Sequence, residues 1–277
     1  MRNAIKYYYN IDVTQIDYFD DYYLFDNFML KEIKDSINFD IYNLIIQYNI
    51  KIHKIIVNIF GLYYTKINNK NYVLYELCEY NEITLNEIID YSNKLSMINL
   101  SNLKINDFVK LWKNKTDYYE KMFYVNDNTM LNEAFPYFIG LSELSIRIYN
   151  EFKKNISYRI VHRRIKSFYD FYCPDNFIID SVTREYSEFL KTQFFIYNNN
   201  VEYIIDFVFA NYHSINECLY FFSRICFPSY FYDYINNFKL IKRFISKINK
   251  FEILLDYISN KIQNLYGLEI IYWIKKI

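Results

Sequence analysis

The spacing of apolar residues changes near residue 80, and this change limits the fold more than any other feature of the sequence. Between residues 11 and 79 the chain carries short apolar runs, namely YYLF, FMLKEI, KIIVNIFGLYYTKI and NYVLYEL, separated by polar turns. Short runs rich in Ile, Val, Tyr and Phe are typical of β-strands. After Tyr80 apolar residues recur every three or four positions, which is the period of a helix face. We therefore predict a strand-rich region over 1–80 and a helical region over 81–277.

Local patterns refine this division. The segment DSINFDIYNLIIQYN predicts one helix within the strand-rich region, with Ser36 as its N-cap, and INNKNY, residues 67–72, is typical of a hairpin turn. In the helical region Asn81, Asn106 and Asn128 are candidate N-caps. One interruption of the helical pattern, YRIVHRRI followed by NFIIDS, predicts two short strands.

Charge and composition exclude several classes of protein. The 32 basic and 32 acidic side chains cancel, so no long-range field draws the chain to nucleic acid or to an anionic surface. No run of about 18 residues is free of charge, so no membrane span is expected. The four cysteines form no C-x-x-C pair and the three histidines are scattered, so no metal site is expected. Because MRNAIKYYYN lacks an apolar signal-peptide core, we expect a protein of the reducing cytoplasm.

The stretch VHRRIKSFYDFYCPDNFIID resembles the catalytic segment of the aminoglycoside and choline phosphotransferase group. That group has a His-Gly-Asp loop, an asparagine and an Ile-Asp strand that binds metal. The resemblance places His162 on the histidine, Arg163 on the glycine, Arg164 on the catalytic aspartate and Asp180 on the metal-binding aspartate. Lys31 of FMLKEI similarly takes the position of the phosphate-binding lysine.

Within this group, the chain is similar to spore-coat kinase-like proteins of the CotS/YutH type. The similarity lies in four stretches, HRR, PDNFIIDSVTREYSEFLKTQFF, LWKNKTDYYE and YFIGLSELSI. The resemblance implies an α+β, protein-kinase-like, two-lobed fold. It has a small strand-rich N-lobe, residues 1–80, and a larger, mostly helical C-lobe, residues 81–277. It also implies other proteins as partners, spore-coat components among them, and a location in the cytoplasm or the spore coat.

An arginine at position 164 argues against phosphoryl transfer. The family aspartate positions the acceptor hydroxyl while metal ions neutralise the phosphates. A guanidinium group cannot accept the proton, and its charge repels magnesium. Moreover Gly61 is the first glycine, beyond the strands that should carry a phosphate-binding loop. We therefore expect a catalytically inactive, pseudokinase-type protein that acts by binding or assembly and has no cofactor, with Lys31, His162, Arg164 and Asp180 as vestigial positions.

A second register of the same segment remains open. YCPDNFII can be aligned with the family's His-Pro-Gly-Asn stretch, and YIIDF, residues 203–207, with its metal strand. Asn176 and Asp206 would then be the metal ligands, and Asp170 would lie beside the catalytic position. We prefer the register that contains Asp180.

The alternative function is an ATP-dependent phosphotransferase acting on a small hydroxylated molecule. It would use Mg-ATP, Lys31, one of the two metal-strand aspartates, and Asp170 as an unconventional base. The same residues also have ordinary structural interpretations. Lys31 would be a surface lysine at a strand edge, and an ion pair between Arg164 and Asp180 would replace the metal with a structural lock.

Overall fold

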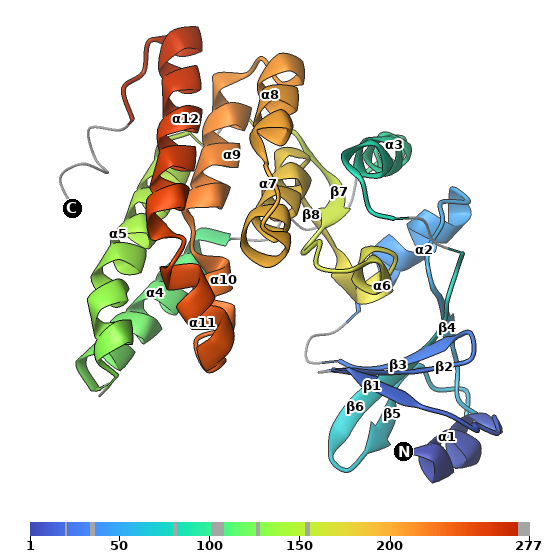
Figure 1. Cartoon of the computed structure of the whole chain (residues 1–277). Coiled ribbons are helices and arrows are strands. Elements are labelled where there is room, and N and C mark those ends of the chain that lie inside the picture. Colours follow the sequence, from blue (N-terminus) through green and yellow to red (C-terminus); the bar gives the residue numbers. More distant parts are fainter. Residues whose placement is uncertain are drawn as a thin grey trace. The chain divides into compact units, whose positions relative to one another are not determined.

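The computed structural model describes residues 1–19, 21–33, 37–79, 82–100, 108–125, 128–152 and 156–270, and Figure 1 shows the chain coloured along its sequence. The chain divides into two compact units. The first contains Met1–Asn99 and His162–Ile178, and the second contains Leu100–Val161 and Ile179–Ile277. The units do not coincide with the predicted lobes, since the described residues 82–99 and 162–178 group with the strand-rich region.

An antiparallel sheet of six strands forms the core of the first unit within the described residues. Its strands are β1 (Asp17–Phe19), β2 (Tyr22–Phe25), β3 (Phe28–Glu32), β4 (Lys54–Ile56), β5 (Thr65–Ile67) and β6 (Lys70–Glu76). Their order is β1-β2-β3-β6-β4, with β5 also paired to β6. The central strands β3 and β6 carry the most buried residues, among them Leu30 and its register partner Leu74.

A two-residue turn sets the register of the β5–β6 hairpin. Asn68 and Asn69 have φ values of 48° and 63°, and Ile67 pairs with Lys70. Two consecutive left-handed residues match the right-handed twist of the strands, and asparagine tolerates this conformation better than most residues. The predicted hairpin at residues 67–72 is therefore confirmed.

Short helices accompany this sheet. They are α1 (Arg2–Tyr9), α2 (Phe39–Gln47), α3 (Leu85–Leu95) and α6 (Phe168–Phe171). Helix α1 buries Ile5 and Tyr9 in a core cluster that also contains Leu30 and Leu74. The helix expected near residue 37 is confirmed as α2, but its N-cap is Asn38, whose side chain accepts hydrogen bonds from two backbone N–H groups. The cap expected at Ser36 lies outside the described residues.

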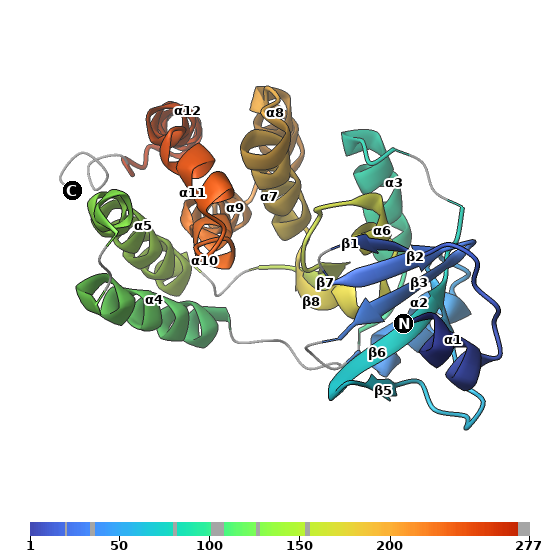
Figure 2. The same cartoon turned by 60° about the horizontal axis from the view of Figure 1, so that its bottom comes forward.

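The second unit is mainly helical (Figure 2). Its elements are α4 (Phe108–Val125), α5 (Thr129–Phe152), α7 (Thr183–Lys191), η3 (Thr192–Tyr197), α8 (Glu202–Asn211), α9 (Ile215–Cys226), α10 (Ser229–Asp233), α11 (Phe238–Ile245) and α12 (Ile248–Tyr266). Helix α9 is the central element, because it contacts α5, α7 and α12 and is buried from Glu217 to its end. Asn128 accepts a hydrogen bond from the Leu131 N–H, as expected of an N-cap, whereas Asn81 and Asn106 lie outside the described residues.

The two predicted short strands are confirmed as β7 (Tyr158–His162) and β8 (Phe177–Ser181), which form a separate two-stranded sheet. Two other strand predictions are wrong. Residues 203–207, the strand of the second register, lie in helix α8. The run KIIVNIFGLYYTKI is not continuous strand, because the loop between β4 and β5 interrupts it with exposed side chains.

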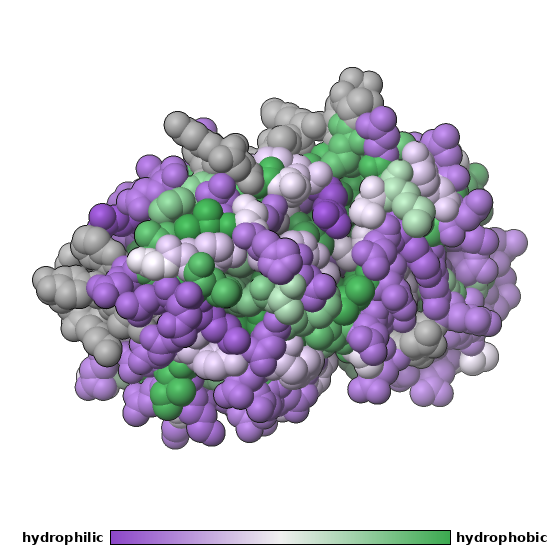
Figure 3. Space-filling view, turned by 90° about the horizontal axis from the view of Figure 1, so that it is seen from above, coloured by the Kyte–Doolittle hydropathy of each residue, from purple (hydrophilic) through white to green (hydrophobic). Residues whose placement is uncertain are grey.

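Hydrophilic residues cover most of the face drawn in Figure 3, and hydrophobic residues form smaller groups between them. Across the described part of the chain, none of the helices combines the length and the apolar character that crossing a membrane requires.

The cap of α2 allows a test of the first unit. Asn38→Ala removes the acceptor for the N–H groups of Asp40 and Ile41, so we expect the free energy of unfolding to fall by about 1 kcal/mol. Asn43→Ala, at an exposed position inside the same helix, should have no such cost because alanine favours helix. Urea denaturation followed by circular dichroism compares the two, and equal losses would contradict the capping role.

Candidate functional site

The ammonium group of Lys31 is buried in the first unit. Lys31 lies on β3 between Tyr22 of β2 and Val73 of β6, and the residue is 6% exposed. Its Nζ lies 3.0 Å from Asp170 Oδ1 and 3.1 Å from Asp175 Oδ2. The interpretation as a surface lysine at a strand edge is therefore wrong, because β3 has a neighbouring strand on each side.

Local structure places the two carboxylates near Lys31. Asp170 lies in α6, which begins after Ser167, and the Ser167 hydroxyl accepts a hydrogen bond from the Asp170 N–H and donates one to Asp170 Oδ2. Asp175 lies in the 3-10 turn η2 (Pro174–Asn176), where Pro174 occupies the first position. Proline fixes φ there without losing a hydrogen bond, because the first N–H of such a turn has no partner within it.

Asn176 braces the loop that carries these acids. Its Oδ1 accepts the Arg164 N–H at 2.9 Å, and its Nδ2 donates to the carbonyls of Arg164 and Asp170 at 2.7 and 2.9 Å. In addition, the Asn176 carbonyl accepts the Arg163 N–H. The amide of this buried residue is therefore engaged at both ends by backbone groups of its own loop.

The charges around Lys31 determine its protonation. Burial alone disfavours an ammonium, but Cys173, Asp170 and Asp175 outweigh it and raise the pKa of Lys31 well above its ordinary value. Burial also raises the pKa of the Cys173 thiol, so this group is neutral near pH 7. The negative charge that offsets the burial of Lys31 therefore comes from the carboxylates of Asp170 and Asp175, and Lys31 stays protonated.

His53 fixes the other side of the loop. Its Nδ1 accepts the Cys78 N–H at 3.2 Å, its Nε2 lies 3.1 Å from the Tyr169 carbonyl, and its backbone N–H donates to the Tyr172 carbonyl. One acceptor and one donor match the neutral imidazole with its proton on Nε2. Burial lowers the pKa of His53 to about 4, so the ring is neutral near pH 7.

His162 and Arg164 occupy different environments. The His162 ring is buried and stacks on Phe171, with ring centroids 4.1 Å apart. Arg164 is partly exposed, and its Nη1 lies 3.5 Å from the Arg163 carbonyl. Position 164 thus carries a guanidinium group, and the backbone of this residue bonds to the Asn176 amide.

Asp180 lies in the second unit and is bonded at both of its oxygens. Oδ2 is 2.7 Å from Arg184 Nη1, while Oδ1 accepts hydrogen bonds from the Ser181 N–H and the Tyr220 hydroxyl. The residue is 1% exposed. Arg184, at the start of helix α7, therefore forms the ion pair with Asp180 that the sequence had suggested for Arg164.

Further buried charges surround this pair. Glu188 Oε1 lies 2.9 Å from Lys191 Nζ and 3.0 Å from Arg224 Nη2. Burial, followed by the charge of Arg224, lowers the pKa of Arg184 to about 10, which still leaves it protonated near pH 7. The aromatic ring of Phe108 also faces the guanidinium group of Arg184, 4.7 Å from its centroid.

Asp206 is an exposed residue in α8. It forms an ion pair with Lys261 at 2.9 Å and accepts a hydrogen bond from the Tyr257 hydroxyl at 2.7 Å. These hydrogen bonds lower its pKa below the ordinary value. Among the described residues, no group of three or more His, Cys, Asp or Glu side chains is arranged to hold a metal ion.

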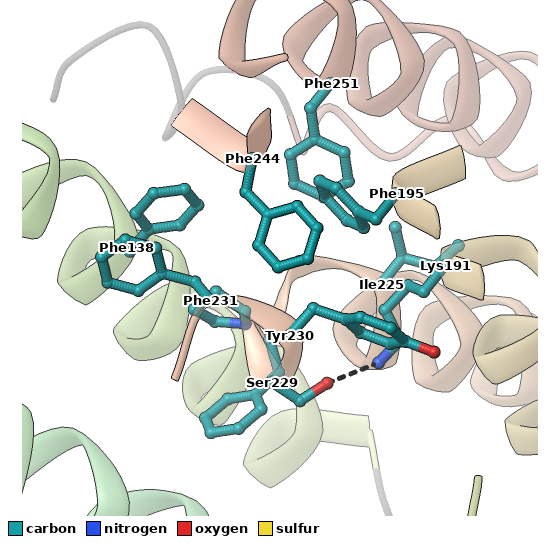
Figure 4. A pocket seen from close by; sticks show the side chains of 11 residues that line it. Phe138, Lys191, Phe195, Ile225, Ser229, Tyr230, Phe231, Phe244 and Phe251 are labelled. Carbon is teal, nitrogen blue, oxygen red and sulfur yellow. Dashed lines mark hydrogen bonds between the residues drawn. The ribbon is translucent and has the colours of Figure 1, made fainter. Parts of the chain in front are cut away.

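An apolar pocket lies elsewhere in the second unit (Figure 4). Its lining is dominated by aromatic rings, and the charged end of Lys191 points to Ser229 and to the Arg224 carbonyl, at 3.2 and 3.0 Å. The lining residues are Phe138, Lys191, Phe195, Ile225, Phe227, Pro228, Ser229, Tyr230, Phe231, Phe244 and Phe251. The amine is bonded to the protein, so little in this pocket would recognise a nucleotide or a sugar.

The sequence did not lead us to predict Asp175 as an ion-pair partner of Lys31, or His53 as a residue that bonds to the Asp170 loop. Asp175 directly precedes the family-like asparagine, so its position was a usable signal. His53 carried no signal, because it lies more than a hundred residues before the loop it braces. Arg184 lies four residues after Asp180, but Asp180 belongs to a strand and Arg184 to a helix, so no regular spacing marked the pair.

The fold has known counterparts. It superposes on a spectinomycin phosphotransferase solved with ADP and spectinomycin with a TM-score of 0.58 and 13% identity, covering 99% of this chain and 96% of the other. An aminoglycoside phosphotransferase from Alicyclobacillus acidocaldarius gives a TM-score of 0.60 at 8% identity, with 93% and 95% covered. An amicoumacin kinase solved with AMP-PNP and Ca²⁺ gives 0.56 at 10% identity, with 90% and 92% covered.

No protein-family model matches the sequence, and a search of curated proteins finds no match either. The structural likeness nevertheless shows that the chain has an α+β, protein-kinase-like fold with a strand-rich N-lobe and a larger helical C-lobe, as the sequence predicted. The fold is that of aminoglycoside phosphotransferase-like enzymes.

His53 should make stability depend on pH. Its pKa is lower in the folded chain than in the unfolded chain, so the unfolded state takes up the proton first as the pH falls. We expect full stability above pH 6.5 and a progressive loss of up to about 3 kcal/mol between pH 6.5 and 4. His53→Gln should flatten this dependence in urea denaturation, whereas His213→Gln, at an exposed histidine, should retain it. If stability depends on pH equally in the two variants, the pH dependence does not come from His53.

The Asp180 pair should matter far more than an exposed one. Asp180→Asn leaves the buried Arg184 without its carboxylate, so we expect a loss of about 3 to 5 kcal/mol in the free energy of unfolding. Asp206→Asn, at a carboxylate with 54% side-chain exposure, should cost less than about 1 kcal/mol. Thermal and chemical denaturation measure both, and similar values would argue against a structural role for Asp180.

Proposed function

We propose that this protein is a kinase-fold protein that does not transfer phosphate and acts by binding other molecules. The observation that carries the proposal is that protein groups already bond to the side chains of Asn176 and Asp180. The resemblance gives Asp180 as the metal-binding aspartate in the preferred register and Asn176 as a metal ligand in the second register. Here backbone groups engage the Asn176 amide at both ends, and Arg184, Tyr220 and Ser181 engage both oxygens of Asp180.

The surroundings of Lys31 support the same proposal. In phosphoryl transfer a lysine at this position neutralises phosphate charge, so its ammonium must be accessible to the nucleotide. Two carboxylates already neutralise Lys31, and the group of three carries a formal charge of minus one. A phosphate would have to displace these carboxylates and approach them against electrostatic repulsion.

A partner protein is the expected ligand under this proposal. The resemblance to spore-coat kinase-like proteins names coat components as candidate partners and the spore coat as a location, and both rest on that resemblance. Binding of this kind requires no metal or nucleotide, and therefore no cofactor is included in the proposal.

One observation favours phosphotransfer as the second candidate. Asp170 lies 3.0 Å from Lys31 and its side chain is 24% exposed, so a carboxylate is available beside the family-like lysine. With Mg-ATP bound, Asp170 would accept the proton of a small hydroxylated substrate, and Lys31 would turn from the carboxylates to a phosphate. The spectinomycin phosphotransferase and the amicoumacin kinase, which share this fold, are phosphate-transferring enzymes by name.

Nucleotide binding distinguishes the two candidates. For the non-transferring protein we expect no rise in melting temperature at millimolar Mg-ATP and no ADP release with aminoglycoside or choline acceptors. A nucleotide bound at a hundred times its Kd would raise the melting temperature by about 5 to 10 °C.

A rise of that size, together with ADP release, would overturn the proposal. Asp170→Asn would then have to abolish ADP release, while Asp12→Asn, in the exposed pair with Lys6, would serve as the control for the substitution itself. A rise without ADP release would also count against the proposal in its present form, because it would show an accessible nucleotide site.

A further inference from the structure

The loop between β4 and β5 presents its apolar side chains to solvent. Val57, Ile59, Phe60, Leu62 and Tyr63, which we call the apolar loop, are 46%, 59%, 56%, 58% and 46% exposed. Single exposed apolar residues are common, but five within the seven residues 57–63 mark a candidate interaction site. By contrast, most of the aromatic residues from Tyr220 to Tyr232 are buried in the second unit.

Internal hydrogen bonds hold the apolar loop in this conformation. The buried Asn58 accepts the N–H groups of Phe60 and Leu62 on its Oδ1, at 3.0 and 3.1 Å, and its Nδ2 donates to Thr65 Oγ1 at 3.1 Å. Its backbone N–H donates to the Leu62 carbonyl, and its carbonyl accepts the Gly61 N–H. The hydrogen bonds of Asn58 therefore define the conformation of the loop. Because Asn58 occupies the interior of the loop, the apolar side chains point to solvent.

The turn of the apolar loop at Gly61 is open to solvent. Gly61, at φ 75°, has no atom within 4 Å of the position where a Cβ would lie. The Ile59 N–H donates to the Tyr8 carbonyl, and the Phe60 ring lies 6.2 Å from that of Tyr7, which is 62% exposed. Helix α1 therefore extends the apolar surface with a further aromatic side chain.

Basic side chains flank this surface. Arg2 and Lys6 are exposed on α1, and Lys54 and Lys66 are exposed on the strands that lead into and out of the apolar loop. Lys6 pairs with Asp12, an acid at the same end of the unit. The Tyr8 hydroxyl donates to the Lys66 carbonyl, which fixes β5 against α1. Cations and aromatic side chains thus occupy the same end of the first unit.

We propose that the apolar loop and helix α1 dock this protein onto the surface of a lipid bilayer that contains anionic lipids. An exposed apolar loop inserts readily into the interfacial region, where tyrosine and phenylalanine are favoured. The zero net charge gives no long-range attraction, but the flanking cations contact anionic headgroups at short range. The proposal does not depend on whether the protein transfers phosphate.

Vesicle flotation of the full chain tests this proposal. We expect the protein to float with phosphatidylcholine vesicles that contain a quarter phosphatidylglycerol, and less with phosphatidylcholine alone. Ile59→Ser/Leu62→Ser should lower binding about tenfold or more, because two inserted aliphatic side chains are lost. Ile253→Ser/Leu265→Ser changes the same residue types on α12, where they are 69% and 58% exposed, and should bind as the unaltered protein does.

A second measurement reports insertion directly. The emission of Phe60→Trp should shift to shorter wavelength when the anionic vesicles are added, beyond any change in the unaltered protein. Absence of flotation, equal loss in both serine variants, or an unshifted emission would overturn the proposal. So would concentration-dependent dimerisation in sedimentation that Ile59→Ser/Leu62→Ser abolishes, because the surface would then be a contact between copies.

Discussion

The ammonium of Lys31 is balanced by two carboxylates that lie 139 and 144 residues further along the chain. A buried cation without such partners would be very unfavourable, so this interaction ties the loop of Asp170 and Asp175 to the sheet. It accounts for why residues 162–178 belong to the strand-rich unit. His53 and Asn176 add hydrogen bonds that hold the same loop from two sides.

The same principle governs the second unit, where buried charges are compensated by protein groups. Asp180 is matched by Arg184 and Tyr220, and Glu188 by Lys191 and Arg224. In a phosphotransferase some of this compensation would be left to metal ions and phosphate. The fold can therefore hold its buried carboxylates in ion pairs with its own arginine and lysine side chains, which stabilise the protein.

Much of the fold could be predicted from the sequence because its signals are local. The hairpin at Asn68 and Asn69 follows from turn chemistry, and β7 and β8 follow from short apolar runs bounded by polar residues. The loop after β4 was mistaken for strand, because the burial that distinguishes a strand from an exposed apolar loop is not local. Residues 203–207 show the same ambiguity, since a short apolar run can suit either a strand or a helix such as α8.

The sequence by itself determined which residue types occupy the family-like positions: a lysine at 31, an arginine at 164 and an aspartate at 180. Only the tertiary structure decided what these groups bond to. Lys31 meets Asp170 and Asp175, and Asp180 meets Arg184 rather than Arg164. The reason is physical, because a side chain's partners are set by burial and by contacts between distant segments, and neither is encoded in the spacing of residues along the chain.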